Sequence, residues 1–385
     1  MKILHICLGA FFPDGYSYQE NMLPKFHKRM GFDVEVIASL VTFDGNGKIT
    51  YYEKPSSYYN EYNILVKRLK YKEPTIVYKT MRRFQGFKEE LWKSNPDIIF
   101  IHNCQFMDID LVAEYAKRKK VTIFVDNHAD YSNSARNILS KYILHRCIWR
   151  RCANLIEPYT TRFYGVLPAR VDFLREMYGL PNEKCKLLVM GADDDLINKA
   201  SRYDSIKAIR NKFNILDDDF LIVSGGKIDF FKTQTLLLMQ AVKEIPNAKI
   251  RLIVFGSVIN ELKAKFFDLV DGDRVQYAGW VDSKDSYTYF AAAQLVVFPG
   301  RHSVFWEQTV AQGIPMICKY WKGTTHVDVG GNVKFLYEDS VSAIRYEIEN
   351  LISNSNELNK MREVAIKKGK RSFSYNDIAR KSITI

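Results

Sequence analysis

The sequence contains no run of about 18 consecutive apolar residues, the length that a helix needs to cross a bilayer. We therefore expect no transmembrane helix. The first apolar stretch ends at Gly9 without a small-residue cleavage site, so it predicts a buried strand rather than a signal peptide. The six cysteines form no CxxC pair, which argues against a disulfide framework and against zinc. These absences predict a protein of the reducing cytoplasm.

Acidic residues are too few to balance the basic ones, and the formal net charge is +12. Such an excess suits nucleic acid, anionic lipid or simply solvated helix faces. No RNA- or DNA-binding motif is present, so we expect no nucleic-acid partner. Basic clusters occur at 67–72, 117–120 and 146–151. The stretch Lys141–Arg151 also holds apolar residues, as a helix lying on a membrane would; the alternative is an ordinary half-buried helix.

Short apolar runs recur along the chain with helical patterns between them. Runs that are apolar throughout are typical of parallel strands covered on both faces, so the sequence predicts two doubly wound α/β domains. The expected strands are Ile3–Leu8, Val34–Ala38, Ile98–His102, Thr122–Val125, Leu155–Glu157, Phe163–Val166, Leu187–Met190, Leu221–Ser224, Ile250–Phe255, Val275–Tyr277, Leu295–Phe298, Met316–Lys319 and Val333–Leu336.

The break at Gly191 predicts the domain junction. We expect an N-terminal domain of residues 1–190, joined by a C-terminal helix at 366–385, and a C-terminal domain of residues 191–365. A tyrosine-rich polar stretch, Tyr51–Tyr62, predicts a long mobile loop.

Two lysines, Lys227 and Lys232, follow the strand expected at Leu221–Ser224. The pair Gly225 and Gly226 predicts a tight turn that lets the backbone approach a ligand, and the lysines supply point charges. This arrangement predicts a cradle for a diphosphate. The simpler alternative is a pair of surface lysines.

A second segment, 298–315, also leaves a strand, turns on a glycine and opens a helix. Its one acid, Glu307, has apolar neighbours, and an unpaired buried acid is costly. We expect its partner to be the hydroxyls of a ribose; the alternative is a solvent-facing helix acid. The helix start at Ser303 would offer free N–H groups to the diphosphate.

These segments resemble those of GT-B glycosyltransferases of the retaining GT4 kind, which are common in bacterial capsule, O-antigen and exopolysaccharide assembly. The pair Gly226-Lys227 with Lys232 is similar to the family's Gly-Arg with a lysine five residues on. Gly191-Ala-Asp resembles its junction segment Gly-Val-Asp, and 306–315 resembles its Leu-Glu-Ala-Met-Ala-x-Gly-x-Pro. The resemblance covers nearly the whole chain. It implies two Rossmann-like domains facing a cleft, with the C-terminal helix crossing back to the first domain.

One departure from the family concerns a second glutamate, which it carries eight residues before the helix acid and which is Pro299 here. The family's contact to the donor sugar is therefore in doubt. The residues available to replace it as donor contacts are Arg301, His302, Ser303 and Val304. The resemblance also places Trp280 and Val281 where the nucleotide base binds, with a core tryptophan as the alternative.

The N-terminal domain offers a further set of candidates. The loop Gly9–Gly15 follows the first strand and would face the cleft, with Gly9 and Gly15 as donor contacts, although it is not a GxGxxG fingerprint. Residues that begin the next helix would touch acceptor or diphosphate. In similar enzymes a histidine like His128 contacts the transferred sugar, and His102 is a second candidate; the alternative for each is a structural histidine. The acceptor candidates are Tyr16, Tyr18, Gln19, His102 and His128.

The sequence thus predicts transfer of a sugar, most readily from a UDP-linked donor, to a lipid-linked glycan, with retention at the anomeric carbon. Lys227, Lys232, Glu307 and His128 are the expected catalytic residues, and no nucleophile is assigned. The resemblance implies no metal and no cofactor. The +12 charge suggests attachment to the anionic inner face of the membrane. The alternatives are a nucleotide-sugar epimerase of the same fold, and a non-catalytic basic protein that binds nucleic acid or membrane.

Overall fold

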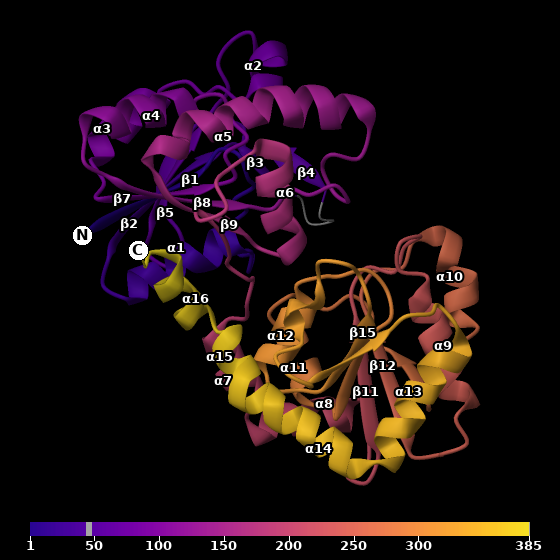
Figure 1. The fold of residues 1–385 in the computed structure, drawn as a ribbon. Coiled ribbons are helices and arrows are strands. Elements are labelled where there is room, and N and C mark those ends of the chain that lie inside the picture. Colours follow the sequence, from indigo (N-terminus) through magenta and orange to yellow (C-terminus); the bar gives the residue numbers. More distant parts are fainter. Residues whose placement is uncertain (44–47, 385) are drawn as a thin grey trace. The chain divides into compact units, whose positions relative to one another are not determined.

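The computed structural model describes residues 1–43 and 48–384, which form two compact units (Figure 1). The first unit comprises Met1–Val189 together with the C-terminal residues from Ile378 onward. The second unit is Met190–Asp377. Only the end of the last helix therefore belongs to the first unit, whereas the sequence prediction placed all of 366–385 there. No helix in this described part of the chain has both the length and the apolar character needed to span a bilayer.

The first unit is built on an eight-stranded sheet in the order β10-β9-β8-β7-β1-β2-β6-β5. All neighbouring strands are parallel except β5 and β6. Its central strands are almost fully buried, as expected for a sheet with helices on both faces. The strands are β1 (Lys2–Cys7), β2 (Asp33–Ser39), β5 (Ser56–Tyr59), β6 (Leu65–Leu69), β7 (Ile98–His102), β8 (Thr122–Asn127), β9 (Thr160–Gly165) and β10 (Cys185–Leu187).

A small hairpin of β3 (Val41–Phe43) and β4 (Ile49–Tyr51) stands beside this sheet. The helical segments of the first unit are α1 (Gln19–Arg29), α2 (Thr75–Met81), α3 (Phe87–Ser94), α4 (Ile109–Arg118), the π-helical η1 (Leu139–Trp149), α5 (Arg150–Ile156), the short η2 (Glu157–Tyr159), α6 (Pro168–Tyr178) and the end of α16 (Tyr375–Ser382).

Three sequence predictions in this unit are wrong. The strand expected at Leu187–Met190 lies two residues earlier, since β10 ends at Leu187. Leu155–Glu157 is helical, because Cys152, Ala153 and Ile156 are buried at helical spacing and the strand starts only at Thr160. Residues 51–62 are not one long loop: 56–59 form β5, which pairs with β6.

The first basic cluster, 67–72, is not a solvated face, because it begins within β6. Lys67 is buried and its Nζ lies 3.0 Å from Glu90 and 3.3 Å from Glu35. Arg68 is buried as well and lies 3.0 Å from Asp14. The charges of these two residues are therefore neutralised inside the first unit.

The second unit contains a six-stranded, wholly parallel sheet in the order β13-β12-β11-β14-β15-β16. Its strands coincide closely with the predicted ones: β11 (Phe220–Gly225), β12 (Ile250–Phe255), β13 (Val275–Tyr277), β14 (Leu295–Phe298), β15 (Met316–Lys319) and β16 (Val333–Leu336). The helical segments are α7 (Asp194–Ala200), α8 (Tyr203–Lys212), α9 (Gln234–Glu244), α10 (Asn260–Phe267), α11 (Ser286–Ala291), α12 (Phe305–Ala311), η3 (Thr325–Val327), α13 (Val341–Ser353), α14 (Ser355–Val364), the π-helical η4 (Ala365–Gly369) and α15 (Lys370–Ser372).

Alternate residues of each strand face opposite helix layers. Ile222 and Leu252 belong to the core that α9, α13 and α14 cover, so their neighbours Val223 and Ile253, which are also buried, face the other layer. The sequence prediction of an α/β fold with two doubly wound, Rossmann-like domains is thereby confirmed.

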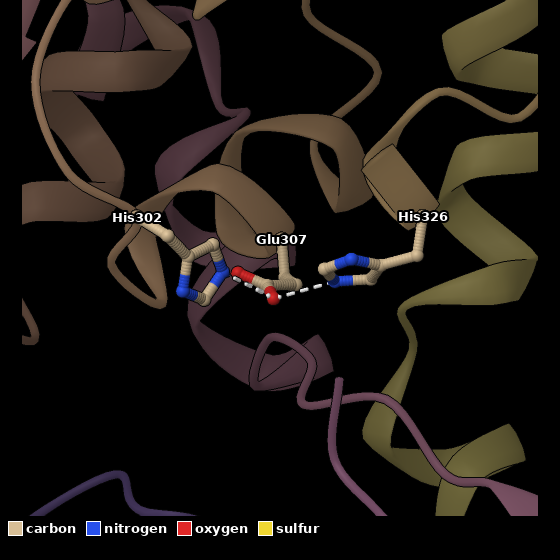
Figure 2. Close-up of side chains that lie close together, drawn as sticks. All are labelled: His302, Glu307 and His326. Carbon is tan, nitrogen blue, oxygen red and sulfur yellow. Dashed lines mark hydrogen bonds and ion pairs between the residues drawn. The ribbon is translucent and has the colours of Figure 1, made fainter. Parts of the chain in front are cut away.

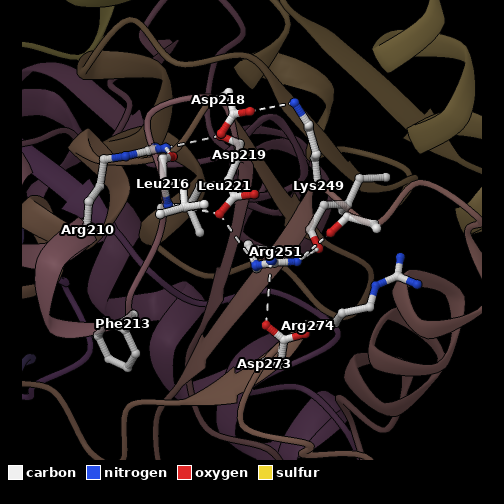
Figure 3. A network of polar contacts seen from close by, with 12 residues as sticks. Arg210, Phe213, Leu216, Asp218, Asp219, Leu221, Lys249, Arg251, Asp273 and Arg274 are labelled. Carbon is white, nitrogen blue, oxygen red and sulfur yellow. Dashed lines mark hydrogen bonds and ion pairs between the residues drawn. The ribbon is translucent and has the colours of Figure 1, made fainter.

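At the amino ends of β11 and β12, a network of charged groups joins the strands (Figure 3). Arg251 lies 3.5 Å from Asp219 and 3.6 Å from Asp273, and the Asp219 carboxylate accepts a hydrogen bond from the N–H of Leu216. Parallel strands place their amino ends together. This network therefore braces the edge of the sheet opposite to the carboxyl ends, and it holds the strands in register without taking part in the site described next.

Candidate functional site

A hollow of about 300 Å³ opens at the carboxyl ends of β11, β12 and β14 in the second unit. The chain runs outward from β11 through β12 to β13 and then returns to the other side of β11 as β14, so the order of the strands reverses here. Such switch points are where doubly wound sheets bind ligands. The lining residues come from four loops: Gly226, Lys227, Lys232, Phe255, Gly256, Ser257, Trp280, Val281, Ser283, Ser303, Val304 and Phe305.

The turn after β11 depends on glycine. Gly226 has φ +124°, which side-chain-bearing residues rarely adopt, and its N–H donates to the carbonyl of Phe255 at 3.0 Å. A Cβ at Gly256 would lie 2.0 Å from the carbonyl oxygen of Gly226. The loops after β11 and β12 therefore pack backbone against backbone, which leaves the hollow beside them open.

The two predicted lysines lie together in this hollow but in different surroundings. Lys227 is exposed and its Nζ stands 3.9 Å from Asp229. Lys232 is half-buried, and burial lowers the pKa of its ammonium, an effect that Asp229 only partly offsets. Among the described residues, no carboxylate lies within ion-pair distance of Lys232. A desolvated cation without a close counter-ion is unfavourable, so an anionic ligand would relieve it.

Trp280 lies at the edge of the hollow, and 69% of its surface is exposed. The alternative that it is a core residue is therefore wrong. An exposed indole face next to two lysines suits a flat ring attached to a phosphate. Val281 also lines the hollow.

Glu307 on α12 is fully buried and is held by two histidines (Figure 2). Its Oε1 accepts hydrogen bonds from Nε2 of His302 and Nε2 of His326, both at 2.8 Å. Burial alone would raise the pKa of Glu307, but the two imidazoles outweigh burial and lower the pKa to about 2. Its Oε2 has no partner among the described residues. Glu307 is therefore a fixed carboxylate with one oxygen still able to accept a hydrogen bond.

His302, Glu307 and His326 lie close enough together to be considered as metal ligands, since one ligand atom of each falls within 4.8 Å of the others. A metal-bound histidine normally donates its second ring N–H to an acceptor. Nδ1 of His326 is buried and has no hydrogen-bond partner among the described residues. The cluster therefore fits a hydrogen-bonded clamp on Glu307 better than a metal site.

The structure divides the predicted donor residues of the second unit into two groups. Gly226, Lys227, Lys232, Trp280, Val281, Ser303 and Val304 line the hollow. Arg301, His302 and Glu307 do not. The guanidinium of Arg301 lies over the ring of Phe231, 4.7 Å from its centre. His326 was missed altogether, because a single histidine 19 residues after Glu307 carries no local signal.

In the first unit, the loop after β1 is also shaped by glycine. A Cβ at Gly9 would lie 2.1 Å from the carbonyl oxygen of Asn103, and Gly15 has φ +79°. The loop leads to the stacked rings of Tyr16 and Tyr18, whose centres are 5.3 Å apart. Tyr18 is exposed. This part of the predicted acceptor set therefore presents aromatic surface.

Of the remaining candidates of the first unit, His102 and His128 lie at the carboxyl ends of β7 and β8, and Gln19 begins α1. Nε2 of His128 lies 3.7 Å from Glu20 and 3.5 Å from Asp126, and 21% of its side chain is exposed. Burial lowers the pKa of His128, but the two carboxylates outweigh burial and raise it above its usual value. Gln19 is almost fully buried, and neither of its amide atoms has a partner among the described residues. His102 is fully buried, and its two ring nitrogens already face His5 and Asp126, so it has no polar atom left for a ligand.

Comparisons with known proteins give distant likenesses. No protein-family model matches the chain. Mannosylfructose-phosphate synthase of Agrobacterium fabrum is 26% identical over 188 residues, which are 44% of this chain and 38% of the relative. The matched part of the chain thus spans about two fifths of that relative's length.

Several solved structures match nearly the whole chain. HepE of Anabaena in complex with UDP has a TM-score of 0.70 at 16% identity, with 99% of this chain and 98% of that chain covered. WaaG, a glycosyltransferase involved in lipopolysaccharide biosynthesis, has a TM-score of 0.66 at 14% identity, with 99% and 98% covered. A UDP-GlcNAc 2-epimerase from Neisseria meningitidis has a TM-score of 0.62 at 12% identity over 99% and 98%. These likenesses confirm the predicted GT-B fold.

Proposed function

We propose that this protein is a glycosyltransferase that takes its sugar from a nucleoside-diphosphate donor, most readily a UDP-linked one. The observation that carries the proposal is Lys232, a desolvated cation that lines the same hollow as Gly226 and the exposed Trp280. No carboxylate of the described residues lies within ion-pair distance of it. Two cations for the diphosphate and a ring for the base are the groups that such a donor requires. HepE, which shares the fold, was solved with UDP and with UDP-glucose, and these complexes favour the same nucleotide here.

The hollow suggests how the second unit would assist the reaction. As the bond between sugar and diphosphate breaks, negative charge grows on the leaving diphosphate. Lys227 and Lys232 both line this hollow and would stabilise that growing charge, and such binding is stronger in the transition state than in the ground state. We propose retention at the anomeric carbon from the GT4 resemblance, and we assign no nucleophile.

We further propose that the acceptor is a glycan. Phe11, Tyr16, Tyr18 and Phe43 form a connected group of aromatic rings, with centres 5.3 to 5.7 Å apart between neighbours. Phe11 and Tyr18 are exposed. Exposed aromatic faces offer apolar area together with polar groups at low entropic cost, which suits the faces of sugar rings. This aromatic group would therefore hold the sugar that precedes the site of transfer.

We propose that the glycan is lipid-linked, as in bacterial surface-polysaccharide assembly, and that the first unit docks on anionic membrane. Around η1, the side chains of Ile138, Leu139, Tyr142 and Ile143 are exposed. The cations Lys141 and Arg146 lie within the same segment. Apolar side chains that face solvent between cations are typical of a helix that lies in the headgroup region.

Vesicle sedimentation tests this docking. We expect anionic vesicles to carry the protein down at low salt and to release it at high salt, because each cation near the surface contributes about 1 kcal/mol and is screened. The double variant Leu139→Asp, Ile143→Asp should stay in the supernatant. Ile76→Asp, at an exposed position of α2, is the matched control and should sediment like the parent protein. Sedimentation of the double variant equal to that of the parent would remove η1 from the membrane contact.

An epimerase of the same fold is the rival function, and a basic protein without catalysis is a further one. Incubation with donor alone separates them. We expect UDP-sugar to be consumed with release of UDP only when a glycan acceptor is added, because transfer needs a second substrate. Interconversion of the donor sugar without acceptor would establish the epimerase instead. If the protein binds no UDP, GDP or ADP by calorimetry, the proposed enzymatic function fails.

A further inference from the structure

Four fully buried side chains form a continuous line across the first unit. His27 of α1, His5 of β1, His102 of β7 and Asp126 of β8 follow one another in space. Nδ1 of His27 lies 3.1 Å from Nε2 of His5, Nδ1 of His5 lies 3.0 Å from Nε2 of His102, and Nδ1 of His102 lies 2.8 Å from Asp126 Oδ2. Since β1, β7 and β8 are adjacent parallel strands, the sheet itself holds these groups in place.

The line begins at the C-terminal segment of the chain. Nε2 of His27 lies 3.0 Å from the carbonyl oxygen of Ala379 and 3.0 Å from Oγ of Ser382. The hydroxyl of Ser382 donates its one proton to that same carbonyl, at 2.8 Å. A carbonyl can only accept a hydrogen bond. Nε2 of His27 must therefore carry a proton.

This starting point fixes the direction of every later hydrogen bond. Burial lowers the pKa of His27 to about 4, and burial and the neighbouring imidazoles lower that of His5 well below its usual value, so both are neutral. A neutral imidazole has one donor and one acceptor nitrogen. His27 Nδ1 therefore accepts from Nε2–H of His5, and His5 Nδ1 accepts from Nε2–H of His102.

The last contact, between His102 and Asp126, then requires one proton more than three neutral histidines carry. With Nε2–H of His102 already donated to His5, its Nδ1 still faces the carboxylate of Asp126. Two acceptors cannot lie 2.8 Å apart without a proton between them. Asp126 has a pKa well below its usual range, since its burial is outweighed by His102 and His128, so the proton belongs to His102.

We infer that this line is a one-way hydrogen-bond relay, which starts at the Ala379 carbonyl of the C-terminal segment, keeps both ring nitrogens of His102 protonated, and thereby sets the charge that Asp126 presents to His128. His102, His5 and His27 are thus positioning residues for His128. The functional consequence rests on the proposed function, because His128 is a candidate to contact the transferred sugar. The protonation pattern itself does not depend on that function.

The groups that face the end of the relay come from several elements. Glu20 of α1 and Asp126 of β8 raise the pKa of His128, while Arg170 of α6 lowers it. Asp126 is further faced by the thiols of Cys7 and Cys104, both of which have raised pKa values because of burial. With His102 doubly protonated, the charge of Asp126 is largely neutralised. Glu20 is then the main carboxylate that raises the pKa of His128.

The full-length protein labelled with ¹⁵N-histidine tests the relay by NMR, without any need for catalysis. We expect His5 and His27 to carry their proton on Nε2, and His102 to carry protons on both nitrogens at neutral pH. The inference would be overturned if His102, His5 and His27 were all protonated only on Nδ1. That outcome would leave the proposed glycosyltransferase activity untouched.

The variant His27→Phe cuts the relay. His5 is then free to donate from Nδ1 to His102, His102 needs only its Nδ1 proton, and the extra proton leaves. Because Asp126 is then no longer neutralised, the NMR titration midpoint of His128 should rise by about one unit, and the pH profile of kcat/KM should move with it. An unchanged midpoint in a folded His27→Phe protein would contradict the relay.

Two further variants separate the relay from simple packing. In His27→Gln the amide NH₂ donates to Ala379 and the amide oxygen accepts from His5, so the direction is preserved and the midpoint of His128 should stay at the parent value. Ser382→Ala leaves the Ala379 carbonyl in place and should also leave the midpoint unchanged. If His27→Phe does not fold, His5→Phe gives the same test. In that variant His102 should lose its second proton. A shift as large in Ser382→Ala as in the cut variants would refute the role of the carbonyl.

Discussion

Replacement of Lys232 by alanine should weaken binding of UDP about tenfold or more and should not destabilise the unliganded protein. A hydrogen bond to a charged group contributes about 1.5–3 kcal/mol, and the ammonium of Lys232 has no close carboxylate of its own among the described residues. Because burial lowers the pKa of this ammonium, its charge is unfavourable in the empty hollow. The melting temperature of Lys232→Ala should therefore equal or exceed that of the parent protein.

Isothermal titration with UDP and a thermal melt without nucleotide measure the two effects. Lys263→Ala, at an exposed position of α10, is the matched control and should change neither the Kd nor the melting temperature. Addition of the same excess of UDP should raise the melting temperature of the parent more than that of Lys232→Ala, since stabilisation by a ligand grows with the logarithm of its concentration divided by Kd. An unchanged Kd for UDP in Lys232→Ala would remove this residue from the donor site.

The largest effect on stability is expected from Glu307→Gln. The two imidazoles lower the pKa of Glu307 from 4.5 to about 2, which corresponds to about 3 kcal/mol of stability at neutral pH. A carboxyl whose folded-state pKa is depressed contributes this stability fully above its unfolded pKa. The contribution is lost as the pH falls toward the folded value. The difference in unfolding free energy between parent and Glu307→Gln should therefore be largest near pH 7 and should shrink between about pH 4.5 and pH 2.

Urea unfolding at a series of pH values measures this difference. Glu338→Gln, at an exposed position after β16, is the control and should follow the parent protein at every pH. Donor binding gives a second readout, because Oε2 of Glu307 is the carboxylate oxygen left without a partner in the described structure. If Oε2 accepts hydrogen bonds from the ribose hydroxyls, Glu307→Gln should weaken the binding of the normal UDP-sugar more than that of a 2′,3′-dideoxy analogue. Equal losses of affinity for the two donors would show that Glu307 has only a structural role.

The strands of both parallel sheets were largely readable from the sequence, because residues covered on both faces must be apolar throughout. The six strands of the second unit and the strand at Ile98–His102 are examples. The strands β5 and β6 were not readable, since β6 contains Lys67 and Arg68. Their charges are tolerated inside only because Glu35, Glu90 and Asp14 reach them from distant parts of the chain. No local sequence pattern indicates that these ion pairs will form.

The residues of the candidate site also divide into those that the sequence predicted and those that only the structure revealed. Glycine at Gly226 and lysines at Lys227 and Lys232 mark a turn and two cations within seven residues, so the sequence by itself determined that part of the hollow. Tertiary structure alone decided the state of Glu307, because His326 reaches it from η3. It also decided the relay from Ala379 to Asp126, whose members are brought together by five separate elements. Local chemistry depends on neighbours along the chain, whereas buried charge depends on partners that only folding brings within reach.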